Sequence, residues 1–98
     1  MSDRQGRCFE LAFSAMLEPE NAGAVLMHGT VIGRGGSRID HAWLIIEDGA
    51  AIYDPVFDRL ILPTSYNARF APEEERRYSA KEAAEEALNQ GHSGPWHK

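Results

Sequence analysis

Residues 41–55 read HAWLIIEDGAAIYDP, and this stretch predicts a β-hairpin whose two strands meet at the Asp-Gly pair of residues 48–49. Glycine at the second turn position supplies the positive φ that a two-residue hairpin turn requires. Counting outward from that turn places Trp43 opposite Asp54, so His41 lies one diagonal step from Asp54. Both side chains then project from the same face of the sheet, where an imidazole can reach a carboxylate.

The segments around the hairpin predict further strands and two helices. Apolar spacing favours a helix over 8–17, which must end before Pro19. A Ser-x-x-Glu capping box at 79–82, good helix formers and a closing glycine predict a second helix over 81–90. Runs of β-branched and apolar residues predict strands over 25–32, 39–47, 50–53 and 59–62.

Two segments do not extend this pattern. Pro63 and the polar residues 64–67 weigh against continuing the last strand, and the charged run 73–77 is interpreted as a solvated segment. Both faces of the strand that carries His41 look apolar. We therefore expect the N-terminal helix to cover one face and the C-terminal helix, with Trp96, to cover the other.

The composition indicates one small domain that spans residues 1–98. The chain has 43% hydrophobic and 26% charged residues, which suffices for one enclosed core. Its net charge of −5 and its ten lysines and arginines argue against nucleic acid as a partner. A single cysteine cannot form an intrachain disulfide, and no apolar signal or membrane-spanning run is visible, so we expect a cytoplasmic protein that does not enter a membrane.

The only cysteine, Cys8, opens the N-terminal helix, and its position there suggests thiol chemistry. In the first turn, free backbone N–H groups and the positive end of the helix dipole favour a thiolate. His41 could accept the thiol proton, and Asp54 could orient its imidazole. The backbone N–H of Cys8 is a candidate donor to an oxyanion, Gln5 could add a side-chain donor, and Trp43 should lie beside the site.

Three sequence blocks resemble the transglutaminase-like branch of the papain-like cysteine enzymes. Residues 6–12, GRCFELA, look like the nucleophile block G-x-C-x-x-x-A, residues 41–43 like the histidine block H-A-W, and residues 54–55 like the acid block D-P. The resemblance implies an α+β, papain-like fold in which a helix packs on an antiparallel sheet. It also implies that Cys8 is the nucleophile, His41 the base and then the acid, and Asp54 the orienting residue.

Together with these residues, the resemblance implies a thiol hydrolase of amide or peptide bonds that acts through a thioester and needs no cofactor. Its substrate would be a peptide, a protein or a small amide. Two alternatives stay open: an acyltransferase or transglutaminase with the same triad, and a catalytically inactive papain-like module that binds or regulates a partner. The chain is short for the family, which argues against a large protein-binding cleft.

Other readings of the same residues are less favoured. A lone cysteine in a small domain is often a buried core residue, and only its position at the helix start and its partners argue otherwise. A metal site would have to draw on dispersed residues, because no short-spaced pair of ligands is present, and none is expected. The residues considered for it are Cys8, His28, His41, Asp54, His92 and His97.

Overall fold

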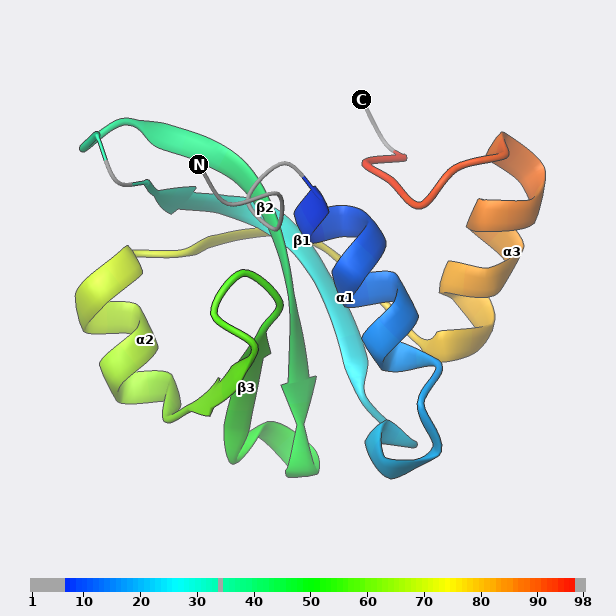
Figure 1. The fold of residues 1–98 in the computed structure, drawn as a ribbon, viewed down its shortest axis with the longest axis horizontal. Helices are drawn as coiled ribbons and strands as arrows, with labels where there is room; N and C mark the ends of the chain where they lie inside the picture. Colours follow the sequence, from blue (N-terminus) through cyan, green and yellow to red (C-terminus); the bar gives the residue numbers. More distant parts are fainter. Residues whose placement is uncertain (1–6, 34, 97–98) are drawn as a thin grey trace.

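The computed structural model describes residues 7–33 and 35–96, which form three α-helices and a five-stranded antiparallel sheet (Figure 1). The helices are α1 (Cys8–Met16), α2 (Pro63–Phe70) and α3 (Ala80–Gln90), with short 3₁₀ turns η2 (Pro19–Asn21) and η3 (Glu47–Gly49). The strands are β1 (Val25–Ile32), β2 (Arg38–Ile46), β3 (Ala51–Asp54), β4 (Arg59–Ile61) and β5 (Glu73–Tyr78). Their order in the sheet is β4-β3-β2-β1-β5. No helix among the described residues is long and apolar enough to span a membrane.

The β2–β3 hairpin has the predicted register. Ile45 pairs with Ile52, as counting outward from the turn requires. The turn residues Asp48 and Gly49 both adopt positive φ, 55° and 94°, which is the backbone shape of the mirror-image turns that join twisted strands. The connection between β2 and β3 therefore sets which side chains share a face.

The other predicted elements are present with small differences at their ends. The first helix stops one residue early, so Leu17 lies beyond it and is 56% exposed. Helix α3 carries the predicted capping box between Ser79 and Glu82, and Gly91 follows it with φ 75°. The last predicted strand, 59–62, is observed as β4.

Two elements differ from the sequence interpretation. The segment that begins at Pro63 is helix α2, in which proline occupies a first-turn position where its missing N–H costs nothing. The charged run is β5, a strand at the edge of the sheet on which only Tyr78 is buried. Charged side chains suit an edge strand because they oppose pairing with another chain.

The sheet separates two apolar cores. Helices α1 and α3 and the docked Trp96 pack on the face that carries Ala42 and Leu44, whereas α2 lies on the other side (Figure 1). The expectation that α1 and α3 cover opposite faces is therefore wrong. The face that carries Trp43 is covered by Tyr66 of α2, a residue that the sequence interpretation left outside any helix.

Candidate active site

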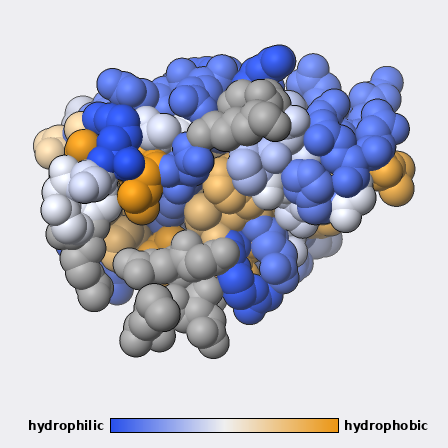
Figure 2. Space-filling model, turned by 90° about the horizontal axis from the view of Figure 1, so that it is seen from above, coloured by the Kyte–Doolittle hydropathy of each residue, from blue (hydrophilic) through white to orange (hydrophobic). Residues whose placement is uncertain are grey.

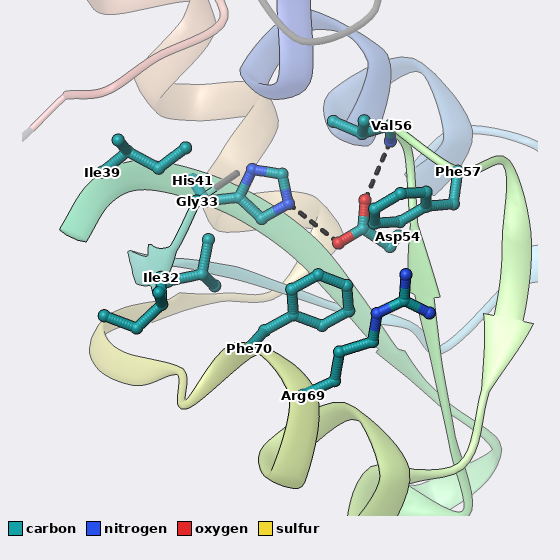
Figure 3. Close-up of a pocket in the computed structure, with 10 residues that line it drawn as sticks. Ile32, Gly33, Ile39, His41, Asp54, Val56, Phe57, Arg69 and Phe70 are labelled. Carbon is teal, nitrogen blue, oxygen red and sulfur yellow. Dashed lines mark hydrogen bonds and ion pairs between the residues drawn. The ribbon is translucent and has the colours of Figure 1, made fainter. Parts of the chain in front are cut away.

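Asp54 is the last residue of β3, and its carboxylate is buried with three donors around it. Its Oδ2 accepts hydrogen bonds from His41 Nε2 at 2.8 Å and from the Tyr66 hydroxyl at 2.6 Å. Its Oδ1 accepts from the backbone N–H of Val56 at 2.9 Å (Figure 3). The residue is only 1% exposed, so these donors replace the hydrogen bonds to water that the carboxylate loses on burial.

His41 lies on β2 and is held by its neighbours on the same face. Its ring is stacked on that of Trp43 with 6.0 Å between ring centroids. On β1 the residue opposite His41 is Gly29, where an added Cβ would collide with the carbonyl of Glu73 and crowd the Trp43 ring. The glycine allows these groups to pack closely behind the imidazole, which is 6% exposed.

Cys8 is the first residue of α1, and the structure brings its side chain to His41. A hydrogen bond between the two side chains is among the causes that raise the pKa of His41. Because His41 uses Nε2 for Asp54, its remaining ring nitrogen, Nδ1, is the one that can exchange a proton with sulfur. Cys8, His41 and Asp54 thus form a continuous hydrogen-bonded series from α1 through β2 to β3.

The pKa values of His41 and Asp54 are shifted in opposite directions by their contacts. Burial alone lowers the pKa of His41, but hydrogen bonds to Asp54 and Cys8 and the charges of both raise it to about 9. Burial alone raises the pKa of Asp54, but the hydrogen bond and charge of His41, together with Tyr66 and Val56, lower it overall. The pair is therefore an imidazolium and a carboxylate around neutral pH.

A pocket of about 300 Å³ opens beside this pair. Figure 3 shows His41 and Asp54 on one side of it and Arg69 and Phe70, from α2, on the other. Seen from above, most of the surface is hydrophilic, and apolar side chains gather in its left and central part, toward the β1–β2 hairpin (Figure 2). The residues that line the pocket are Val31, Ile32, Gly33, Ile39, His41, Asp54, Val56, Phe57, Arg69 and Phe70.

The structure brings together the three residues predicted to act, and Trp43 lies next to His41. Trp43 is buried between His41 and Tyr66 and is not among the pocket-lining residues, so it supports the imidazole from behind. Gln5 lies outside the described residues. Within residues 7–33 and 35–96, no three His, Cys, Asp or Glu side chains cluster in a way that could hold a metal ion.

Tyr66 and Arg69 were missed by sequence reasoning. Both belong to α2, where Tyr66 is fully buried and donates to Asp54. The available signal was proline at a helix start followed by aromatic residues at i and i+4, Tyr66 and Phe70. That signal could have indicated a short helix with one aromatic stripe.

A scan against protein-family models gives no match, and searches of curated proteins and of solved structures give none either. The chemistry of the site therefore has to be argued from its own geometry.

The hydroxyl of Tyr66 should contribute measurably to stability. Tyr66→Phe removes one donor to a buried carboxylate, so we expect the free energy of unfolding in urea to fall by about 1–3 kcal/mol. The matched control is Tyr53→Phe, because the Tyr53 hydroxyl donates to the exposed carboxylate of Asp58. Losing this hydrogen bond should lower the free energy of unfolding by less than about 1 kcal/mol. Equal decreases in the free energy of unfolding would show that the hydrogen bond to Asp54 stabilises the fold no more than the exposed one does.

The His41–Asp54 pair should make stability depend on pH in a defined direction. The pKa of His41 is raised from 6.5 to about 9, so its stabilising effect is complete below pH 6.5 and is lost as the pH rises through 9. The pKa of Asp54 is lowered from 3.8, so its effect is complete above pH 3.8 and is lost as the pH falls through the folded-state value.

We therefore expect the free energy that the pair contributes to be greatest between pH 4 and 6.5. Urea unfolding of the wild type and of His41→Gln, measured from pH 4 to 9.5, isolates this contribution. The stability advantage of the wild type should shrink by a few kcal/mol toward pH 9. A difference between the two proteins that stays constant with pH would contradict the raised pKa of His41.

Proposed function

We propose that this chain is a thiol hydrolase of amide bonds, with Cys8 as nucleophile, His41 as base and then acid, and Asp54 as the residue that orients His41. The observation that carries the proposal is the position of one imidazole between a carboxylate and the only thiol of the chain. A nucleophile, a base and an orienting group in hydrogen-bonded order are the parts that acyl transfer through a thioester requires.

The first step follows from the protonation state of the site. His41 already carries its proton as an imidazolium at neutral pH, so the Cys8 sulfur, paired with it as a thiolate, attacks the carbonyl carbon of the amide. As the carbon–sulfur bond forms, the π electrons of the carbonyl move to its oxygen. Asp54 stabilises the imidazolium throughout, because its carboxylate is held ionised by three donors.

The start of α1 can stabilise the oxyanion that results. No side chain caps this helix among the described residues, so the N–H groups of its first turn, beginning with Cys8, are free of such a partner. When the oxyanion collapses, the carbon–nitrogen bond breaks and His41 gives its proton to the departing amine. A water molecule then attacks the thioester with His41 as base, which releases the acid and restores the thiol.

The arrangement also supports a papain-like, transglutaminase-like core as the finer description of the fold. In that core a helix that begins with the nucleophile packs on an antiparallel sheet that carries the histidine and the acid. Here Cys8 begins α1, α1 packs on β1 and β2, and His41 and Asp54 lie on β2 and β3. The three blocks that resemble the family thus lie on the corresponding types of element.

The test is to trap the thioester. The full chain is mixed with p-nitrophenyl acetate, a reactive acyl donor, and quenched in acid for mass spectrometry of the intact protein and its peptides. We expect one acetyl group on Cys8, formed as p-nitrophenol is released, and no acetyl group on the corresponding peptide of a Cys8→Ala variant. Release of p-nitrophenol at the same rate by both proteins, or acetyl groups only on lysines, would contradict the proposal.

A further inference from the structure

Arg69 contacts aromatic rings, whereas three other arginines of the described residues pair with a carboxylate. Arg7, Arg38 and Arg77 each pair with a glutamate. The guanidinium of Arg69 instead lies over two aromatic rings, 5.8 Å from the centroid of Phe57 and 5.3 Å from that of Phe70. Among the described residues, no carboxylate forms an ion pair with it. The group is thus held in place by aromatic faces while its N–H donors are left for another partner.

The pocket next to Arg69 is apolar apart from three residues. Its walls come from the β1–β2 hairpin, from Val56 and Phe57 after β3, and from Phe70 of α2. The other two polar residues, His41 and Asp54, are engaged with each other. Since the imidazolium and the carboxylate cancel in charge, Arg69 carries the remaining charge among the residues that line the pocket, although the chain carries −5 overall.

These observations favour a ligand that has both an apolar group and a negative charge. We propose that the pocket binds an apolar group that carries a carboxylate, and that Arg69 recognises this carboxylate through its planar fork of donors. The inference rests on the proposed function and deepens it, since it names the substrate group that would lie beside His41 and Asp54. An apolar group with a carboxylate is found both in a peptide whose C-terminal residue is apolar and in a small apolar acid.

The position of Arg69 also permits a purely structural role, which the test has to separate. Arg69 is in the last turn of α2, where a cation interacts favourably with the helix dipole. Arg69→Lys keeps that positive charge but loses the planar fork. Arg69→Gln loses both. If Arg69 has only a structural role, its replacement changes stability but leaves the preference for acid over amide unaltered. If Arg69 recognises the carboxylate, its replacement changes that preference more than it changes stability.

The experiment measures binding without requiring catalysis. In a Cys8→Ala background, dissociation constants are measured by calorimetry for N-acetylphenylalanine and for N-acetylphenylalaninamide, which differ only in carboxylate against carboxamide. We expect the acid to bind at least about tenfold more tightly, and this preference to fall to about twofold or less in Arg69→Gln. Arg69→Lys should give an intermediate ratio. Hexanoate, compared with hexanamide, shows whether a non-peptide acid is bound in the same way.

The matched control removes the same charge on the other side of the sheet. Arg76 is an exposed residue of β5 beside α3, so Arg76→Gln should leave the preference for the acid unchanged. Equal binding of acid and amide to the parent protein, or a preference that survives Arg69→Gln, would overturn the inference. These results do not involve the thiol, so they are distinguishable from a failure of Cys8 to form a thioester.

Discussion

Asp54→Asn is expected to slow acylation of Cys8 by about 10²–10⁴-fold. The carboxylate supplies both the hydrogen bond that orients His41 and the negative charge that raises the pKa of its imidazole. Asparagine retains a similar shape but is neutral, and its amide can present N–H to His41 Nε2 and so favour the wrong tautomer. The rate of p-nitrophenol release in the first turnover measures this effect.

The control for Asp54→Asn is the same substitution at Asp58. Asp58 accepts a hydrogen bond from Tyr53 and is exposed, so Asp58→Asn should leave acylation within about twofold of the wild type. Urea unfolding of each variant separates lost chemistry from lost structure, because Asp54 is buried and its replacement costs stability as well. Acylation by a folded Asp54→Asn protein at the wild-type rate would remove Asp54 from the mechanism.

His41→Gln is expected to have an effect of similar size, about 10²–10⁴-fold on acylation. Glutamine can still form a hydrogen bond, but it cannot accept the thiol proton or carry the positive charge that stabilises a Cys8 thiolate. The matched control is His92→Gln, since His92 is exposed and its Nδ1 accepts a hydrogen bond from the backbone of Gly94. The same first-turnover assay, run from pH 5 to pH 9, measures both variants.

A pH profile gives His41→Gln a second readout. In the wild type the imidazolium persists to about pH 9, so acylation should remain substantial below neutral pH. In His41→Gln the rate should instead rise steadily with pH, as it does for a thiol without a partner. Identical profiles for the two proteins would show that His41 does not control the proton of Cys8.

The geometry of the His41–Asp54 pair was predictable from sequence because hairpin register is a local property. The Asp-Gly turn at 48–49 sets the pairing of β2 with β3, and alternation along each strand then sets the face of every side chain. The N-terminal helix was also predictable, because the spacing of its apolar residues matches the period of a helix. These features depend on residues close together in the chain, where spacing alone constrains the backbone.

The parts that were missed depend on contacts between distant segments. Tyr66 is fully buried because it packs on Trp43 and donates to Asp54, and neither contact is visible in the polar sequence around it. Strand β5 is formed from charged residues that would not form a strand without β1 beside them. Tertiary pairing overrode local propensity in both cases. The assignment of α1 and α3 to opposite faces failed for the same reason, because α2 occupies the second face.

The most direct test of the account is the rate at which iodoacetamide alkylates Cys8 at pH 6. At this pH an ordinary cysteine is almost entirely thiol and reacts slowly. The account predicts that Cys8 in the folded wild type reacts at least about tenfold faster than in the urea-unfolded chain, and that His41→Gln abolishes the difference. Slower reaction in the folded wild type than in the unfolded chain would contradict it, because Cys8, which is 5% exposed, would then serve only as a structural thiol.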